Sequence, residues 1–200
     1  MINVRNLGRQ ELPAVWARMR DYTDRRTEQS PDELWFVEHP PIFTLGQNAD
    51  RAHLLNPAEI PVLQIDRGGQ VTYHGPGQLV VYALIDLRRA KLSVRRLVES
   101  LECGVVNAVA AYGVEARGRR DAPGVYVGDM KLAAVGLRIR RNCSYHGIAI
   151  NVDMDLEPFS RINPCGFEHL AVTQLRELCG MGSMERLRAD LEAEYLKRFC

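Results

Sequence analysis

Hydrophobic residues recur three or four positions apart in three stretches of the chain, and this spacing predicts amphipathic helices. The first stretch contains Leu12, Val15, Trp16, Met19 and Tyr22. The second contains Leu97, Val98, Leu101, Val105, Val109 and Tyr112, between Ser93, which can cap a helix, and Gly113, which can end one. The third runs over 183–199 and places Leu187, Leu191 and Tyr195 on one face.

Six stretches between these helices are rich in residues that favour β-strands. They are LWFVEH (34–39), PIFTLG (41–46), QVTYHG (70–75), QLVVYALIDL (78–87), GVYVGDMKLAAVGLRI (124–139) and HGIAINVD (146–153). We expect them to form one sheet. Gly128 and Asp129 predict a hairpin turn that places Lys131 at the start of the returning strand. The predicted fold class is α+β, with helices covering a mostly antiparallel or mixed sheet.

Length and composition favour a single cytoplasmic domain over residues 1–200. We find no repeat, low-complexity tract or Gly/Ser linker that would mark a domain boundary. The formal net charge of +1 argues against nucleic-acid binding driven by global charge. The N-terminus has no apolar signal segment, and the longest apolar run, LVVYALI, is far shorter than the ~20 residues that span a bilayer. An odd number of irregularly spaced cysteines predicts free thiols in a reducing compartment.

Glycines are dense around the predicted strand at 70–75. Gly68, Gly69, Gly75 and Gly77 lie within ten residues of one another, so a ligand can approach the backbone closely there. Two tight turns around an ordinary strand explain the same pattern equally well. The segment matches neither the phosphate-binding Walker loop nor the dinucleotide fingerprint.

Three side chains are candidates for chemistry. His74 and His146 each precede a glycine, and each taken alone is more typical of a hydrogen-bonded structural histidine than of a catalyst. Cys165 stands between Pro164 and Gly166, and a lone cysteine is more often an inert buried thiol. Zinc is an alternative, because Cys143 and His146 are three residues apart and Cys165 and His169 four apart. We favour no metal, because the Cys-x-x-Cys pair that anchors many zinc sites is absent.

Four segments in this order resemble the lipoyl(octanoyl) transferase family: RGGQVTYHGPGQ, APGVYVGDMKLAAVGLRI, SYHGIAINVDMDLEPFSRINPCG and VTQL. The resemblance covers roughly residues 30–180. It implies the fold of the biotin and lipoate protein ligases and a catalytic cysteine at Cys165. It also implies that Lys131 lowers the pKa of that cysteine, and that no cofactor is needed.

The same resemblance implies the reaction and its partners. An octanoyl group passes from octanoyl-acyl carrier protein, through a cysteine thioester, to a lysine ε-amino group on a lipoyl domain. The implied acceptors are the lipoyl domains of 2-oxoacid dehydrogenase acyltransferase subunits and the glycine cleavage H protein. This transfer is the first step of protein lipoylation in lipoate biosynthesis.

The family's substrate-contacting segments fall on residues around the glycine-rich strand and on two later strands. They are Arg67, Gly68, Gly69, Gln70, Val71, Thr72, Tyr73, His74, Ala134, Val135, Gly136, Gly147, Ile148 and Ala149. His146 is a further candidate as an accessory residue. The sequence departs from the family pattern at Phe167, where a tyrosine is common, and at Cys143, an extra thiol that competes with Cys165 for the role of reactive cysteine.

The Pro-Cys-Gly turn suits a nucleophile. Pro164 fixes its own φ, and Gly166 lets an acyl thioester approach the sulfur. Exchange between thiol and thioester is nearly isoenergetic, so a cysteine can accept an acyl group from a carrier thiol and release it downhill to an amine.

Positive charge alone explains little of what Lys131 would contribute. A cation that lowers a thiol pKa from about 8.5 to about 7 raises the thiolate fraction roughly 16-fold at pH 7. The lower nucleophilicity of that thiolate reduces its rate of attack about 5-fold, so the net gain in rate is about 3-fold. We therefore predict that Lys131 also moves protons, which requires a buried lysine. The alternative for Lys131 is an exposed hairpin charge.

Two other functions remain open from the sequence. An ATP-dependent lipoate-protein ligase has the same fold, but the Pro-Cys-Gly turn favours a transferase. A non-catalytic zinc-stabilised module that docks carrier proteins would need Cys143, His146, Cys165 and His169 as ligands.

Overall fold

The computed structural model describes residues 2–166 and 170–199 and contains two β-sheets. The larger sheet has seven strands in the order β1-β2-β6-β10-β9-β8-β7. Their bounds are β1 Ile2–Arg9, β2 Asp32–Glu38, β6 Gln78–Leu84, β10 Cys143–Asn151, β9 Met130–Arg140, β8 Gly124–Val127 and β7 Arg117–Gly118. Only the β1–β2 pair in this sheet is parallel among the described strands.

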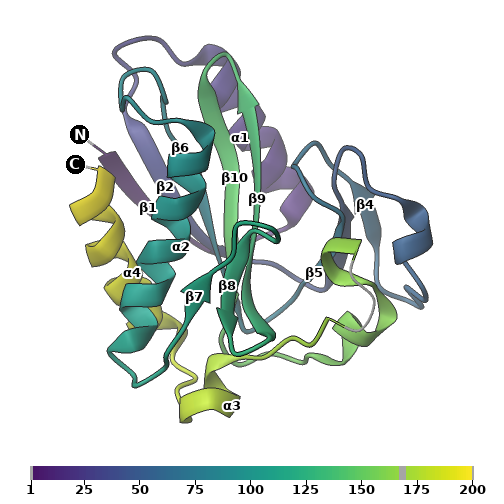
Figure 1. Ribbon diagram of the computed structural model, residues 1–200. Helices are drawn as coiled ribbons and strands as arrows, with labels where there is room; N and C mark the ends of the chain where they lie inside the picture. Colours follow the sequence, from purple (N-terminus) through teal and green to yellow (C-terminus); the bar gives the residue numbers. More distant parts are fainter. Residues whose placement is uncertain (1, 167–169, 200) are drawn as a thin grey trace.

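The smaller sheet has three strands in the order β4-β3-β5 and lies to one side of the larger one (Figure 1). Its strands are β3 Ile42–Leu45, β4 Val62–Gln64 and β5 Val71–His74. The expectation of one sheet is therefore wrong. Pro40 and Pro41 follow β2 after His39 and lack the N–H groups that would continue a ladder, so the chain leaves the large sheet there.

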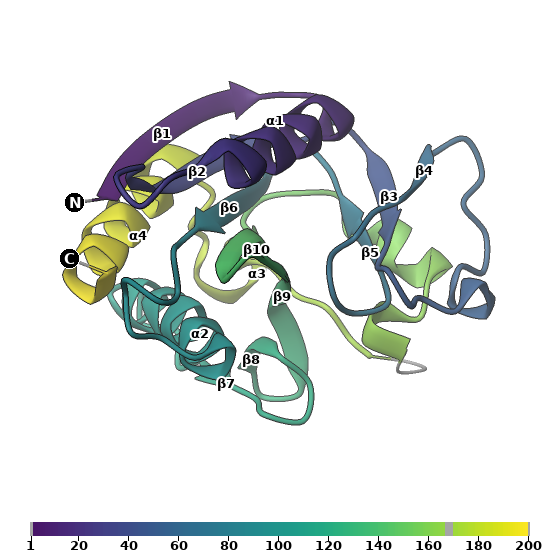
Figure 2. The same cartoon turned by 90° about the horizontal axis from the view of Figure 1, so that it is seen from above.

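Helices cover both faces of the large sheet (Figure 2). The helix α1 (Leu12–Arg25) packs on one face, and α2 (Val94–Ala110) and α4 (Met184–Phe199) pack on the other. Alternate residues of the central strands serve the two cores: Trp35, Val80 and Tyr82 contact α1, whereas Phe36 and Val81 belong to the core with α2 and α4. Burial on both faces explains why these strands are continuously apolar in sequence.

The predicted fold class and the three main helices are confirmed. Ser93 caps α2 as expected, because its side chain accepts a hydrogen bond from the Arg96 N–H. The strand β1 and the short helix α3 (Leu175–Cys179) had no sequence signal. Half of β1 is polar because it is an edge strand, where Arg5 forms a 2.6 Å ion pair with Glu33.

The β9–β10 hairpin is longer than predicted. It turns at Arg141 and Asn142, which have φ of 52° and 61°, and β10 begins at Cys143 rather than at His146. The described part of the chain also contains three short 3₁₀ helices: η1 Arg51–His53, η2 Glu157–Arg161 and η3 Pro164–Gly166. Both η2 and η3 pack on β5, so the Pro-Cys-Gly turn lies against the small sheet.

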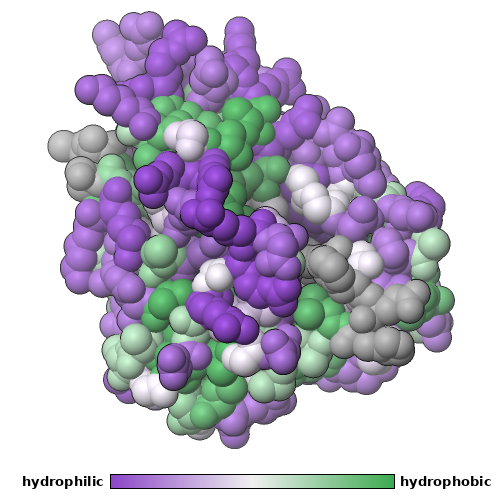
Figure 3. Space-filling model, viewed as in Figure 1, coloured by the Kyte–Doolittle hydropathy of each residue, from purple (hydrophilic) through white to green (hydrophobic). Residues whose placement is uncertain are grey.

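The face of the molecule drawn in Figure 3 is mostly hydrophilic, and polar side chains interrupt its apolar areas. Large exposed hydrophobic side chains of the described residues are scattered singly, at Leu55, Val62, Val94 and Met130. In the part of the chain that the structure describes, every helix is too short or too polar to cross a membrane.

Candidate active site

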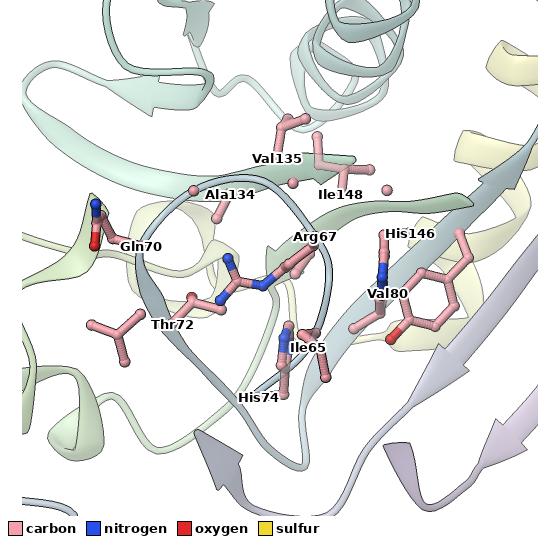
Figure 4. A pocket seen from close by; sticks show the side chains of 16 residues that line it. Ile65, Arg67, Gln70, Thr72, His74, Val80, Ala134, Val135, His146 and Ile148 are labelled. Atoms are coloured by element: carbon pink, nitrogen blue, oxygen red, sulfur yellow. The ribbon is translucent and has the colours of Figure 1, made fainter. Parts of the chain in front are cut away.

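A pocket lies between the two sheets (Figure 4). The 65–70 loop and β5 form one wall, and β6, β9 and β10 form the other. The pocket has a volume of about 550 Å³, its opening to solvent included. It is lined by Ile65, Arg67, Gly69, Gln70, Val71, Thr72, His74, Val80, Tyr82, Ala134, Val135, Gly136, His146, Gly147, Ile148 and Ala149.

The structure brings most of the predicted substrate-contacting residues to this pocket, although they come from three separate segments of the chain. The exceptions are Gly68 and Tyr73. The N–H of Gly68 donates to the Leu137 carbonyl at 2.9 Å and so fixes the 65–70 loop to β9. Tyr73 is buried beside Phe43 and Phe159, with ring centroids 5.4 and 5.5 Å away. Both residues support the wall of the pocket from behind.

A smaller cavity adjoins the pocket where β9 begins. It is lined by Thr72, Gln78, Lys131, Ala133, Ala134, Ala149, Asn151, Phe159, Pro164 and Val172. Three of these, Thr72, Ala134 and Ala149, also line the larger pocket. The two spaces therefore share a boundary, and the predicted catalytic lysine and the proline of the Pro-Cys-Gly turn meet in the smaller one. The backbone of Cys165 belongs to η3, whereas its side chain and residues 167–169 lie outside the described part of the structure.

Lys131 is buried. The hairpin between β8 and β9 forms as predicted, but the Lys131 side chain turns inward and is only 3% exposed, so the alternative of an exposed hairpin charge is wrong. Its Nζ lies 3.3 Å from the Pro123 carbonyl and 5.1 Å from the centre of the Tyr126 ring. This is the desolvated setting that a proton-transferring lysine needs.

The chain that follows the Pro-Cys-Gly turn returns to Lys131. The Lys131 N–H donates to the Ala171 carbonyl at 2.8 Å, and the Thr173 N–H donates to the Lys131 carbonyl at 3.0 Å. Residues 171–173 thus pair with the start of β9 like a short parallel strand. This pairing holds the lysine and the turn at the same cavity.

Glu102 is a buried carboxyl near Lys131 that the sequence did not single out. It lies on α2, and its Oε1 accepts a 2.7 Å hydrogen bond from the Gly124 N–H. Burial raises the pKa of Glu102, and the charge of Lys131 acts in the opposite direction. A glutamate on the apolar face of α2, next to Leu101, was the only sequence signal for it.

A chain of hydrogen bonds begins at Arg67. Its guanidinium donates to the Thr44 Oγ1 from Nε at 3.2 Å and from Nη2 at 2.9 Å. The Thr44 hydroxyl lies 3.4 Å from His74 Nε2, and His74 Nδ1 lies 2.7 Å from the Gln78 Oε1. Because an amide oxygen only accepts, His74 carries its hydrogen on Nδ1. Burial, with smaller effects of His39 and Arg67, lowers the pKa of His74 to about 3, so this imidazole is neutral.

The chain continues from Gln78 toward Lys131. The Gln78 Nε2 donates to the Tyr73 carbonyl at 3.2 Å and to the Asn151 Oδ1 at 3.0 Å. Asn151 Nδ2 donates in turn to the carbonyl of Thr173, whose N–H binds Lys131. A buried polar network therefore runs under the pocket from Arg67 to the residue that pairs with Lys131. Satisfied networks of this kind hold a site rigid.

Asp66 organises the end of the pocket at His146, which lies away from the boundary with the smaller cavity and is called the far end below. Its carboxylate accepts hydrogen bonds from Trp16 Nε1 at 2.8 Å, from His146 Nε2 at 2.9 Å and from the Tyr145 hydroxyl. Burial acts to raise the pKa of Asp66, but the three hydrogen bonds together lower it well below its usual range. Burial lowers the pKa of His146, and Asp66 opposes that shift. His146 has a φ of 61°, so Asp66 holds a strained residue in place.

Backbone alone forms the pocket wall at Gly147. A Cβ atom at this position would lie 1.9 Å from the Val81 carbonyl oxygen on β6, so no side chain fits. This glycine lets β10 and β6 approach each other while it faces the pocket.

Cys143 and His146 do not act together. Cys143 lines a different cavity, with Thr23 and Arg26, and its Sγ lies 3.6 Å from the Arg141 carbonyl, whereas His146 binds Asp66. Burial raises the pKa of Cys143, which makes it a poor rival nucleophile. Among the side chains that the structure describes, no three of His, Cys, Asp or Glu gather as metal ligands; of the four zinc candidates, His169 and the side chain of Cys165 lie outside this description.

The fold is that of solved lipoate- and biotin-protein ligases. A lipoate-protein ligase A solved with ATP superposes with a TM-score of 0.78 at 16% identity, over 98% of this chain and 84% of that one. A biotin protein ligase from Aquifex aeolicus superposes with a TM-score of 0.59 at 12% identity, over 98% and 68% of the two chains. At these identities the likeness shows the fold, and it confirms the predicted one.

The chain belongs to the lipoyl protein ligase A/B catalytic domain family, whose sequence model matches residues 13–196. It is 57% identical to an octanoyltransferase of Alkalilimnicola ehrlichii over 196 residues, 98% of this chain and 91% of that protein. It is 56% identical to an octanoyltransferase of Shewanella loihica over 185 residues, 92% of this chain and 85% of that one. The resemblance seen in the sequence and the acyltransferase class that it implied are confirmed.

Proposed function

We propose that residues 1–200 act as one catalytic domain that moves an octanoyl group from an acyl carrier protein to a lysine of a lipoyl domain. The observation that carries this proposal is the shared boundary of the two cavities. An acyl chain in the large pocket would end where Thr72, Ala134 and Ala149 open toward Lys131 and the Pro-Cys-Gly turn. The thioester would form on Cys165.

The length of the pocket suits a medium acyl chain. Along β9 its lining runs from Ala134 to Gly136, and along β10 from Ala149 to His146, three residues farther on. A strand rises about 3.3 Å per residue, so the lining covers about 10 Å, close to the extended length of an eight-carbon chain. Arg67, His74 and His146 make the far part polar, which disfavours burying more methylenes there.

Lys131 would move the proton in both half-reactions. In acylation it takes the thiol proton of Cys165 and gives it to the departing carrier thiol. In deacylation it takes a proton from the attacking amine and gives it to the Cys165 sulfur as the amide forms. The burial of Lys131 supports this role, because a lysine exchanges its proton near neutral pH only where its charge is disfavoured.

The proposed donor is octanoyl-acyl carrier protein. The proposed acceptors are lipoyl domains of 2-oxoacid dehydrogenase acyltransferase subunits and the glycine cleavage H protein. One solved structure of similar fold comes from an archaeal lipoylation system that comprises a bipartite lipoate protein ligase and its E2 lipoyl domain. We place the reaction in the cytoplasm, because Cys103, Cys143 and Cys179 are free thiols, which suits a reducing compartment.

Transfer without nucleotide tests this function. Octanoyl carrier protein and a lipoyl domain should give octanoylated lipoyl domain, detected by intact mass, with neither ATP nor a metal ion, because the thioester already carries the activation. Free octanoate without ATP is the matched negative control. A requirement for ATP would point to ligase chemistry, and loss of activity with a chelator would point to a metal enzyme.

A further inference from the structure

His53 lies beside the Pro-Cys-Gly turn, although neither a motif nor the pocket lining singles it out. A methyl group placed on Gly166 would lie 3.2 Å from His53 Nε2 and 3.3 Å from the Gln70 Cγ. Gln70 lines the acyl pocket, so the imidazole stands where the mouth of the pocket meets the turn. The side chain is half-buried and therefore also reaches solvent.

Backbone hydrogen bonds fix His53 to the turn. The Asn163 N–H donates to the His53 carbonyl at 2.8 Å, two residues before Cys165. The N–H groups of Leu55 and Asn56 both donate to the Arg161 carbonyl, at 2.9 and 3.1 Å. The backbone of His53 is therefore held against the turn, which keeps the imidazole close to it, as a catalytic pair requires.

The two proposed half-reactions differ in their proton balance. In acylation the Cys165 thiol loses one proton and the carrier thiol gains one, so a single shuttle at Lys131 is sufficient. In deacylation the acceptor arrives as an ammonium, forms an amide and thereby loses two protons. The Cys165 sulfur takes one of them, and the other must leave the site.

An unaided acceptor lysine would seldom attack. With a pKa of about 10.4, about one lysine side chain in 2,500 is neutral at pH 7. Imidazole is the side chain that takes up and releases protons near neutral pH, and a half-exposed one can pass the proton on to water. A group of this kind beside the Pro-Cys-Gly turn would supply what the second half-reaction lacks.

We propose that His53 is a second catalytic residue, which accepts the surplus proton of the acceptor ammonium during deacylation and releases it to solvent. The inference rests on the proposed function, because it assigns a step to the same thioester. The N–C bond forms at the carbonyl carbon and the C–S bond breaks. Lys131 transfers one proton from the acceptor nitrogen to the sulfur, and His53 removes the other.

Charged side chains on the contacting elements are few and mostly engaged. On the His53 turn, the Asp50 carboxylate accepts from the Ala52 N–H at 2.9 Å, and Arg51 is exposed. On η2, Arg161 pairs with Glu157 at 2.7 Å. Among the described residues, these are the charged side chains on the elements beside His53. A pH series on His53 has to control for changes in their charge.

Single-turnover measurements of the two half-reactions test the proposal. In His53→Gln, acylation by octanoyl carrier protein should stay within about 2-fold of wild type, while deacylation by a lipoyl domain should slow on the order of 100-fold, the usual contribution of a general base. Deacylation by the variant should also recover at high pH, where the acceptor lysine loses its proton unaided. Arg51→Gln, on the same 3₁₀ turn, is the matched control and should leave both steps unchanged.

Hydroxylamine separates a chemical role from a structural one. It is uncharged at pH 7 and has no surplus proton to lose before it attacks, so it should release the octanoyl group from wild type and from His53→Gln at similar rates. Equal slowing of acylation, lipoyl-domain deacylation and hydroxylamine release would overturn the proposal in favour of a structural role. Unchanged deacylation by the lipoyl domain would also overturn it. Absence of acylation in the wild type would instead contradict the proposed function.

Discussion

The far end of the pocket and the smaller cavity at its other, near end both bury ionisable side chains, but the two regions control the protons differently. At the far end, Asp66 is held ionised by three hydrogen-bond donors, and His74 and His146 are kept neutral by burial. At the near end, the Lys131 Nζ lies by a backbone carbonyl and an aromatic ring, in a cavity that Lys131 shares with Pro164. The far end is built to maintain a shape, and under the proposed mechanism the near end exchanges a proton.

The largest expected effect is at the near end. Lys131→Arg keeps the positive charge, but a guanidinium does not release its proton near neutral pH. If Lys131 shuttles protons, the variant should lose on the order of 100-fold in turnover while folding normally, and Lys131→Met should be no better. Single-turnover acylation and deacylation of Cys165 across pH measure this. Near wild-type rates for Lys131→Arg in both steps would refute the shuttle and leave a charge effect of about 3-fold.

A smaller effect, on stability, is expected from the neutral histidines behind the far end. His39 accepts a 2.7 Å hydrogen bond from the Tyr82 hydroxyl, and burial lowers its pKa to about 4. Because this pKa lies below the unfolded value, the unfolded chain binds more protons as pH falls. The free energy of unfolding should therefore decrease from pH 6.5 toward pH 4, by about 1.4 kcal/mol per pH unit for each such histidine.

Urea unfolding at several pH values, compared between wild type and His39→Gln, isolates this contribution. Between pH 6.5 and 4, the slope of the free energy of unfolding against pH should be about 1.4 kcal/mol per pH unit smaller in the variant than in wild type. The matched control is Arg51→Gln, which leaves the buried histidines intact and should keep the wild-type slope. Parallel curves for wild type and His39→Gln would show that His39 is not held neutral by the fold.

The sequence predicted the elements of the near end better than their surroundings. Gly128 and Asp129 correctly placed Lys131 at the start of β9, but only the fold shows that its side chain turns inward. The periodicity of 12–22 and 97–112 located α1 and α2 because one face of each helix packs on the sheet. The split into two sheets was missed: Pro40 and Pro41 mark a break after β2, but which distant segments pair beyond that break leaves no local pattern.

The polar side chains that support the far end of the pocket had no recognisable pattern in the sequence. Asp66 precedes the Arg67 segment and was passed over because its role depends on Trp16, which is 50 positions away in the chain. His53 lay in a segment without any periodic pattern. Neither a carboxylate that organises a wall nor an imidazole beside a turn is visible until residues far apart in sequence are brought together.

The acyl adduct on Cys165 tests the account most directly. After incubation with octanoyl carrier protein, intact mass should show one added octanoyl group that hydroxylamine removes. The adduct should persist in Cys143→Ala, because that buried thiol lines a separate cavity, and it should disappear in Cys165→Ala. An adduct that survives in Cys165→Ala, or that maps to Cys143, would contradict the account.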